Sequence, residues 1–292
     1  MRSTIVILGG DEREIEIARI FEEQGFNVKL VGFNSYPHEL AFQRISLEAG
    51  LGSGNVFIAP LAGTDEDGIL YTVYSQEKIE LKEDNIKYIK EGSLFLIGRM
   101  SAFLKKSLEF QRVKVLEVVE RDEVAILNSV PTAEGAVKMA IEETRITIHK
   151  SRCLVTGFGR CGITLSRLLY NMGARVAVAA RDGAQLARAW EMGLKPLTLK
   201  EMEREIFQYD IIFNTIPEMI LKSNLIDKLK GEAVIIDIAS SPGGTDFDAA
   251  ARRGLKARLA PGLPGMVAPK TAGQLLARIY LRLLEKHNCI NA

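Results

Sequence analysis

The sequence is poor in cysteine and histidine, and each shortage excludes a class of protein. Its three cysteines, Cys153, Cys161 and Cys289, show neither the spacing of metal ligands nor that of a disulfide framework. We therefore expect no metal site and a reducing, cytoplasmic environment. None of the three histidines follows a predicted strand in the C-terminal half of the chain. This argues against a dehydrogenase that oxidises an alcohol to a ketone, because that reaction needs an acid/base partner for the hydroxyl proton.

The chain also lacks an excess of charge and any long apolar run. It has 292 residues, with 38 Lys+Arg against 37 Asp+Glu, so we expect no nucleic-acid partner. The longest apolar runs have the length of a strand, which argues against a membrane-spanning helix. A predicted strand begins a few residues after Met1, which leaves no room for a signal peptide. The length suits two domains of ordinary size.

Strands and helices are predicted to alternate along the chain. The β-branched and apolar runs predict strands at 4–8, 27–33, 55–61, 93–97, 113–119, 153–156, 175–180, 209–214, 233–238 and 255–259. Between them, helical patterns include 39–49, 85–90 and 102–110, and a terminal helix is predicted at 269–286. This alternation predicts an α/β protein with two doubly wound parallel sheets, each covered by helices on both faces.

A linker helix is predicted to join two domains. Pro131 favours an extended residue before it, and either Ser129 or Thr132 suits the N-cap of a helix that runs to about residue 146. We therefore expect a flavodoxin-like domain at 1–130 and a Rossmann domain, with its linker helix, at 131–292. The terminal helix has apolar residues on more than one face, so we expect it to cross back to the N-terminal domain.

The organising motif is a glycine turn of the form G-x-G-x-x-G. It follows an apolar strand and opens a helical pattern, the βαβ context of a dinucleotide site. Gly157 permits the tight turn, Gly159 lets the backbone approach a pyrophosphate, and Gly162 lets the helix pack closely on the strand. The phosphates would lie at the helix N-terminus. The expected cofactor-binding residues of this turn are Gly157, Phe158, Gly159, Arg160, Cys161 and Gly162.

Cys161, within this turn, has two competing interpretations. The helix dipole would lower the pKa of the Cys161 thiol, which would favour a redox role. Its position in the turn is unconstrained, however, so a redox role is the weaker interpretation.

An earlier turn at 9–13 also follows a strand, but it lacks the second and third glycines and places carboxylates where phosphates would approach. We interpret that turn as a unit that does not bind a nucleotide.

Further turns at the carboxyl ends of strands complete the predicted cofactor site, since ligands of open parallel sheets bind at this edge. The residues expected there are Asn214, Thr215, Pro217, Ala239 and Ser240. The alternative is ordinary turn chemistry, because turns require these residue types.

Arg181 favours NADP over NAD as the cofactor. An NAD site usually has an acid about twenty residues beyond the glycine turn, where this chain has Ala179 and Ala180 followed by Arg181. A guanidinium suits a 2′-phosphate, which it grips through paired N–H donors. Asp182 comes one place later and complicates the assignment. The alternative for Arg181 is a solvated turn charge.

Three motifs together resemble one family. The motifs are NSVPTAEG at 128–135, GFGRCG at 157–162 and PGLPGMVAPKTAG at 261–273. They are similar to those of the dipicolinate synthase A-subunit family, and the resemblance covers essentially the whole chain. It implies formation of dipicolinate, the pyridine diacid of bacterial spores, from a cyclic precursor of the lysine pathway. Together with Arg181, it predicts NADP-dependent oxidation of a cyclic dihydropyridine diacid to dipicolinate. It also implies that the partner is a flavoprotein-like B subunit and that the location is the mother-cell cytoplasm of a sporulating bacterium.

The chemistry of such a diacid suggests where it would bind. Aromatisation removes a hydride and a proton, and the substrate needs anchors for two carboxylates. We expect one carboxylate at the start of the linker helix, near Asn128, Ser129 and Thr132, where free N–H groups attract an anion. We expect the other near Ser240 and Ser241, with Gly262 close by. In the alternative interpretation, Ser129 or Thr132 only caps the helix.

Two other functions and the assembly state are left open. One alternative is a regulatory protein that senses NADP without catalysis, and the other is a two-domain NADP-dependent oxidoreductase of the shikimate or hydroxyacid type. Turnover by the isolated chain separates the first alternative from an enzyme. The sequence identifies no acid/base residue, and a homo-oligomer is compatible with it.

Overall fold

The computed structural model describes residues 3–287, so Cys289 lies outside the described part of the chain. The chain divides into two compact units. Unit 1 is formed by the described residues up to Ala125 and again from Ala268 onward, and unit 2 by Ile126–Val267. The sequence predicted one boundary after residue 130, with a terminal helix that crosses back to the N-terminal domain. In the structure, the unit boundaries lie at Ala125/Ile126 and at Val267/Ala268, and the terminal helix belongs to unit 1.

Unit 1 contains a parallel sheet of six strands in the order β3-β2-β1-β4-β5-β6. The strands are β1 (Thr4–Leu8), β2 (Asn27–Val31), β3 (Gln43–Arg44), β4 (Val56–Ile58), β5 (Leu94–Ile97) and β6 (Lys114–Glu117). β3 has only two residues. The other five strands run in the order 2-1-3-4-5 of flavodoxin-like sheets, as predicted.

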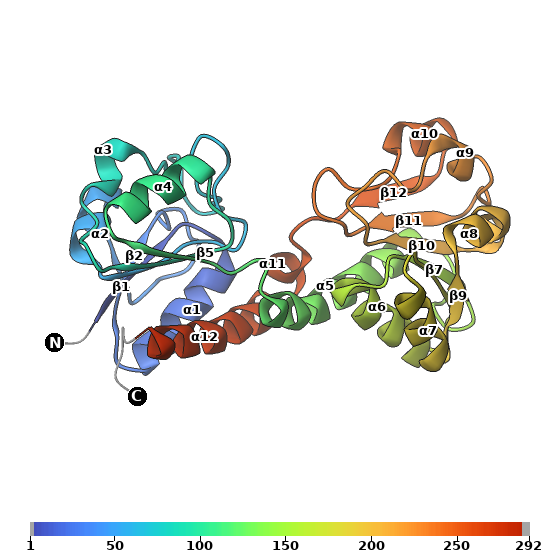
Figure 1. Cartoon of the computed structure of the whole chain (residues 1–292), viewed down its shortest axis with the longest axis horizontal. Helices are drawn as coiled ribbons and strands as arrows, with labels where there is room; N and C mark the ends of the chain where they lie inside the picture. Colours follow the sequence, from blue (N-terminus) through green and yellow to red (C-terminus); the bar gives the residue numbers. More distant parts are fainter. Residues whose placement is uncertain (1–2, 288–292) are drawn as a thin grey trace. The chain divides into compact units, whose positions relative to one another are not determined.

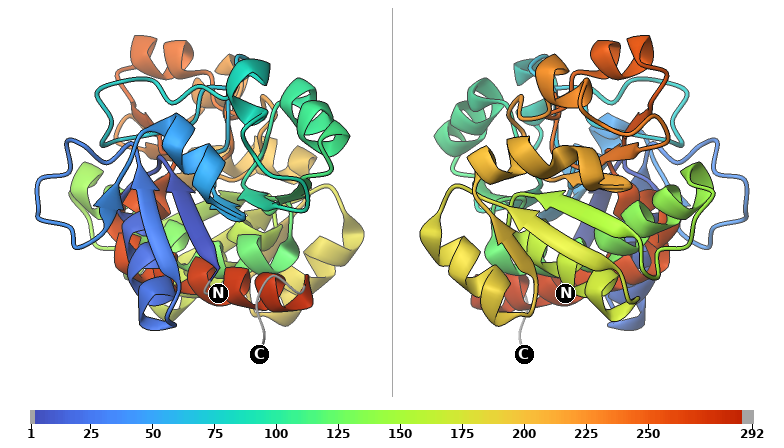
Figure 2. Two further views of the ribbon diagram at one scale, coloured as in Figure 1. Left: turned by 90° about the vertical axis from the view of Figure 1, so that its left-hand side faces the viewer. Right: turned by 90° about the vertical axis from the view of Figure 1, so that its right-hand side faces the viewer.

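Helices cover both faces of this sheet (Figures 1 and 2). They are α1 (Glu12–Glu23), α2 (Leu47–Ser53), α3 (Glu83–Ile86), α4 (Ala102–Phe110) and α12 (Pro269–Lys286). One face packs a core against α2, α3 and α4, with Phe57 and Phe95 stacked in the sheet. The other face carries α1, against which α12 packs so closely that a Cβ at Gly273 would lie 2.7 Å from the Arg13 carbonyl oxygen.

Unit 2 contains a second parallel sheet, in the order β12-β11-β10-β7-β8-β9 (Figure 2). The strands are β7 (Arg152–Thr156), β8 (Arg175–Ala179), β9 (Lys195–Leu197), β10 (Ile211–Asn214), β11 (Val234–Asp237) and β12 (Lys256–Leu259). The chain proceeds from β7 to β8 and β9 on one side and then returns to β10 on the other. The switch point between β7 and β10 is where open α/β sheets bind ligands, at the carboxyl ends of the strands.

Alternate residues of these strands face two separate cores. Cys153, Val155 and Phe213 pack against α5 (Asp122–Glu143), α6 (Arg160–Asn171) and α7 (Gly183–Glu191). Leu154 and Ile212 pack on the opposite face. That face is covered by α8 (Leu199–Glu205), the 3₁₀ turn η1 (Ile206–Gln208), α9 (Ser223–Ile226) and α10 (Phe247–Arg252). The short helix α11 (Leu263–Val267) packs against α5 at Gly135, where a Cβ would lie 3.1 Å from Leu263.

Two helix predictions were wrong in position. The helix predicted at 39–49 begins only at Leu47, with Ser46 as its N-cap, and β3 lies within the range assigned to it. The linker helix α5 begins at Asp122 and not near Ser129, so Pro131 lies inside it. Two acids, Asp122 and Glu123, occupy the first turn of α5. Their negative charges stabilise the helix through the positive end of its dipole.

Residues 3–287 contain no helix that is both long and apolar enough to cross a bilayer. In the same range, no group of three or more His, Cys, Asp or Glu side chains is arranged to hold a metal ion.

Candidate functional site

The glycine turn lies where predicted, between the carboxyl end of β7 and the N-terminus of α6. Gly157 has a φ of +89°, a conformation that L side chains rarely adopt, and its N–H donates to the Ala179 carbonyl oxygen at 2.8 Å. This bond joins the turn to the end of β8, the neighbouring strand. Gly157 therefore sets the sharp change of direction from strand to helix.

The other two glycines of the turn have opposite surroundings. A Cβ at Gly162 would lie 2.3 Å from the Gly157 carbonyl oxygen, so this position is restricted to glycine by the packing of α6 on the strand. A Cβ at Gly159 would meet no atom within 4 Å. Packing within the chain therefore does not restrict position 159, and the open space beside it lies at the mouth of the turn.

The N-terminus of α6 presents free donors. Its N-cap is Gly159, which offers no side chain to the helix, and its first turn contains no acidic residue. Within the described residues, the N–H groups of Gly159, Cys161 and Gly162 have no hydrogen-bond acceptor. Unpaired N–H groups at the positive end of a twelve-residue helix favour an anion.

The matching turn of unit 1 has the opposite character. At the N-terminus of α1, the N–H of Asp11 donates to Glu14 Oε2 at 2.8 Å, and the N–H of Arg13 donates to Asp11 Oδ1 at 2.9 Å. The Gly10 N–H donates to the Tyr71 carbonyl oxygen at 2.9 Å. Donors that a phosphate would require there are thus already bonded within the chain, and two carboxylates occupy the turn.

A row of three buried polar side chains supports the edge of the sheet beside the glycine turn. Thr156, Asn214 and Asp237 end the adjacent strands β7, β10 and β11, and they are paired in register across these strands. All three are fully buried. Thr156 Oγ1 donates to Asn214 Oδ1 at 2.6 Å. Sequence reasoning identified only Asn214 of this row.

Asn214 and Asp237 each shape the loop that follows their strand. Asn214 Oδ1 accepts from the Ile216 N–H at 3.1 Å, and its Nδ2 donates to the Ile216 carbonyl oxygen at 2.9 Å. Asp237 accepts from the N–H groups of Ala239 at 3.0 Å and Gly244 at 2.8 Å, and from the Thr245 hydroxyl at 2.7 Å. Both side chains are therefore held by bonds within the protein and position the loops at 215–217 and 239–244.

The loop residues predicted for the cofactor differ in exposure. Thr215 is partly buried and donates its hydroxyl to the Thr156 carbonyl oxygen at 2.8 Å, whereas Pro217 is exposed. Ala239 is buried, and Ser240 and Ser241 are exposed at the tip of their loop. The exposed loop tips, with the N-terminus of α6, form the accessible part of this edge.

Arg181 and Asp182 follow β8, and their side chains make different contacts. Asp182 is the N-cap of α7, and its Oδ1 accepts from the N–H groups of Ala184 at 2.7 Å and Gln185 at 3.1 Å. Arg181 is exposed, and its guanidinium lies 3.4 Å from the Glu218 carboxylate in the loop after β10. The acid at this edge, Asp182, is therefore bonded to its own helix. Within residues 3–287, the Arg181 side chain is held only by its exposed ion pair with Glu218.

The remaining turn residues face different ways. Phe158 is buried in the core between the sheet and α5–α7, so only its backbone is available to a ligand. Arg160 is exposed in the first turn of α6. Burial raises the pKa of the Cys161 thiol, an effect that Arg160 opposes. The sequence-based expectation of a lowered thiol pKa was wrong, because burial is the largest influence on this group.

The residues predicted to hold a substrate carboxylate lie inside α5. Ser129 is fully buried, and its hydroxyl lies 2.6 Å from both the Ile126 carbonyl oxygen and Thr164 Oγ1. Thr132 donates to the Asn128 carbonyl oxygen at 2.8 Å. N–H groups in the interior of a helix are bonded to the preceding turn. The expectation of free N–H groups here was therefore wrong, and only the side-chain amide of Asn128 is without a bond in the described residues.

Gly262 lies directly before α11, with a φ of +70°, and is exposed. A Cβ there would meet no atom within 4 Å. Its backbone is thus open to a ligand in the same way as that of Gly159.

Comparison with known proteins identifies the family. A family model described as the N-terminal domain of the dipicolinate synthase A subunit matches residues 4–119. The dipicolinate synthase A subunit of Bacillus subtilis (strain 168) is 40% identical over 293 residues, covering 97% of this chain and 96% of the relative. The chain belongs to the family of dipicolinate synthase A subunits. The crystal structure of the dipicolinate synthase A subunit from Bacillus halodurans agrees, with a TM-score of 0.88, 37% identity and 97% coverage of both chains.

This membership confirms the resemblance inferred from the three motifs, including those at 128–135 and 261–273 that lie outside the glycine turn. The fold of the family is shared more widely. A transhydrogenase from Sinorhizobium meliloti has a TM-score of 0.70 at 12% identity, over 96% of this chain and 93% of the other. Likeness at this level of identity shows a common fold and nothing more.

Proposed function

We propose that the chain binds NADP(H) at the carboxyl edge of the unit 2 sheet and acts as the A subunit of a dipicolinate-forming oxidoreductase. One observation carries the proposal: the uncapped, acid-free N-terminus of α6 lies on a turn with open backbone at Gly159, and the neighbouring strand is followed by Arg181. Family membership supports the reaction, because the relatives are named for dipicolinate synthesis.

The residues present fit a dinucleotide that carries a 2′-phosphate. The free N–H groups of α6 would bind the pyrophosphate, and Gly159 would let it approach the backbone. Arg181 would exchange its exposed partner Glu218 for the 2′-phosphate, which offers a stronger, paired set of acceptors. Asp182 is bonded to α7 and does not compete. The nicotinamide, when bound, supplies the hydride acceptor.

The loop tips would hold the diacid. The exposed hydroxyls of Ser240 and Ser241 and the open backbone of Gly262 are donors suited to a carboxylate, and the free amide of Asn128 is a further candidate. Asp237 would keep Ser240 and Ser241 in place through its three bonds to their loop. Conversion of a dihydropyridine diacid to the aromatic pyridine diacid loses one hydride and one proton. Aromatisation drives this loss, so the reaction does not depend on a strong general base.

The test is turnover by the purified chain. Dipicolinate is detected by its ultraviolet absorption after the dihydropyridine diacid and NADP⁺ are supplied, with and without the flavoprotein-like B subunit. We expect dipicolinate together with an equal amount of NADPH. If NADPH binds tightly but neither mixture forms dipicolinate, the chain is a sensor of the cofactor and the catalytic proposal is wrong.

A further inference from the structure

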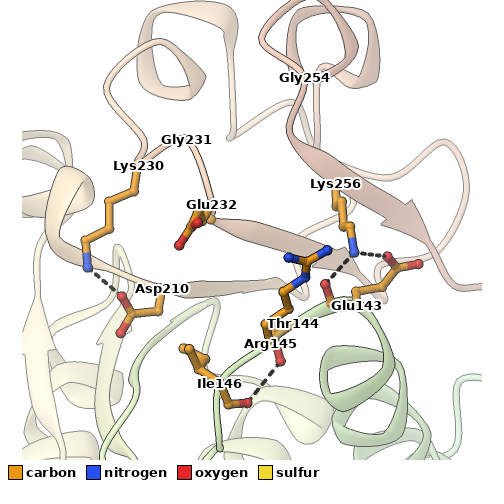
Figure 3. Close-up of a pocket in the computed structure, with 11 residues that line it drawn as sticks. Glu143, Thr144, Arg145, Ile146, Asp210, Lys230, Gly231, Glu232, Gly254 and Lys256 are labelled. Carbon is orange, nitrogen blue, oxygen red and sulfur yellow. Dashed lines mark hydrogen bonds and ion pairs between the residues drawn. The ribbon is translucent and has the colours of Figure 1, made fainter.

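A pocket lies at the opposite edge of the unit 2 sheet, where the strands begin (Figure 3). Asp210 directly precedes β10, Ala233 directly precedes β11, and Lys256 is the first residue of β12. The cavity has a volume of about 450 Å³, within the range of sites for small molecules. The candidate cofactor site lies at the other ends of the same strands, so the two sites are distinct.

Most of the ionisable groups that line this pocket are paired, and the pairs fix its walls. Lys230 Nζ lies 2.5 Å from Asp210 Oδ1. Lys256 Nζ donates to the Glu143 carbonyl oxygen at 2.7 Å and lies 3.4 Å from the Glu143 carboxylate. Arg258, just outside the pocket, donates to the same carboxylate at 2.7 Å and lowers the pKa of Glu143. These bonds tie the end of α5 to β12 and the turn before β11 to β10.

Two opposite charges in the pocket are left unpaired. Neither Arg145, in the turn after α5, nor Glu232, in the turn before β11, makes an ion pair or side-chain hydrogen bond within residues 3–287. Figure 3 shows the two side chains entering the same space from opposite walls. They do not pair with each other. The pocket thus presents one free cation and one free anion on either side of its space.

The surface between these two charges is small or apolar. Ile146 is about half exposed in the pocket, and the other lining positions there include Gly231, Ala233 and Gly254, which leave room for a ligand. A purely anionic ligand would leave Glu232 facing it unpaired, and a purely cationic one would leave Arg145 unpaired. A ligand that carries both a negative and a positive charge would pair Arg145 and Glu232 at the same time.

We propose that this pocket binds a small molecule with a carboxylate at one end, an ammonium group at the other and an aliphatic chain between them, the class to which the basic amino acids belong. Arg145 would hold the carboxylate through its paired N–H donors. Glu232 would hold the ammonium group, and Ile146 would pack against the chain. The proposal concerns a site remote from the cofactor and does not depend on the function proposed above.

Titration calorimetry on the full chain tests this assignment, with L-lysine and 6-aminohexanoate as probes. We expect binding of at least one probe, and a loss of about tenfold in affinity in both Arg145→Gln and Glu232→Gln, the size expected for one charge-assisted contact. Arg188→Gln and Glu203→Gln are matched controls, because both residues are exposed in unit 2 and lie outside the pocket. The controls should bind the probe as the parent does.

Three results would overturn the proposal. One is the absence of measurable heat with both probes at about 10 mM, where a millimolar affinity would be visible. Another is equal binding of hexanoate, which would mean that the pocket holds an anion only. The third is parent-like binding of the probe by Arg145→Gln or Glu232→Gln. NADPH affinity, measured on the same two variants, should stay that of the parent whichever result is obtained.

Discussion

The substitution Gly159→Val distinguishes a role of Gly159 in cofactor binding from a purely structural role in the turn after β7. Gly159 has φ −87° and ψ −160°, a conformation open to any residue, and a Cβ there meets no atom within 4 Å. The fold should therefore tolerate Gly159→Val, apart from about 1 kcal/mol for a poorer helix N-cap. The same side chain would project into the space through which a pyrophosphate reaches the free N–H groups of α6.

The magnitude follows from those donors. A hydrogen bond to a charged group contributes about 1.5–3 kcal/mol, so loss of two such bonds costs about 3–6 kcal/mol. This corresponds to an affinity for NADPH that is at least about a hundredfold weaker. The affinity is measured by titration of NADPH fluorescence, and the fold by circular dichroism and the melting temperature.

Gly162→Ala is the matched control. Its Cβ would lie 2.3 Å from a main-chain oxygen, so this smaller substitution should lower the melting temperature more than Gly159→Val does. The reasoning is refuted if Gly159→Val keeps both the parent fold and the parent affinity for NADPH. The turn would then be a structural feature with no part in cofactor binding.

Three further substitutions test other parts of the two units. Arg181→Ala should weaken NADPH binding about ten- to a hundredfold and leave NADH binding nearly unchanged, and an equal loss for both cofactors would contradict a 2′-phosphate contact. Asp237→Asn places an N–H donor where the carboxylate accepts, so urea denaturation should show a loss of about 2–4 kcal/mol; an unchanged midpoint would refute the bracing role. Burial raises the pKa of Glu14 to about 7, against the opposing charge of Arg13. Between pH 4.5 and about 7, the Glu14 carboxyl is therefore protonated in the folded state and ionised in the unfolded state. The free energy of unfolding falls as pH rises through this range. Glu14→Gln should flatten this dependence by up to about 3 kcal/mol, and parallel curves for variant and parent would show that Glu14 is not its source.

The glycine turn could be predicted because its chemistry is local. Gly157, Gly159 and Gly162 lie within six residues, and each role depends on the backbone beside it. The family, too, was visible in short continuous motifs. Both features require no knowledge of how distant parts of the chain pack.

The start of α5 could not be predicted from its local signals. Ser129, Pro131 and Thr132 have the chemistry of a helix start, yet the helix begins seven residues before Ser129. A proline inside a helix costs about 3 kcal/mol. Packing offsets this cost, because Ala133, Ala136 and Ala140 follow it and are buried against the unit 2 core. That gain depends on the sheet and on α6, which the local sequence does not show.

The hydrogen bonds and the ion pair that hold the loops of the candidate site were not predicted, for a related reason. Asp237 holds residues two, seven and eight positions further along the chain, and the Arg181–Glu218 pair spans 37 positions. One signal was available: an acid at the end of the apolar run 233–238 is unusual for a buried strand. Such a residue calls for donors nearby, and the following Gly-rich loop supplies them.

The turns that precede α1 and α6 differ in what stabilises the N–H groups at the start of each helix. At the N-terminus of α1, Asp11 and Glu14 serve as built-in ligands, so the stabilisation of that helix end is present whenever unit 1 is folded. At the N-terminus of α6 the same donors are left for a molecule from outside, and their contribution grows with its concentration as RT ln(1 + [L]/Kd), about 2.7 kcal/mol at a hundred times Kd. The abundance of the cofactor would thereby set the stability of unit 2. A cell rich in NADP(H) would hold more of the protein folded and protected from proteolysis than a cell that is depleted of it.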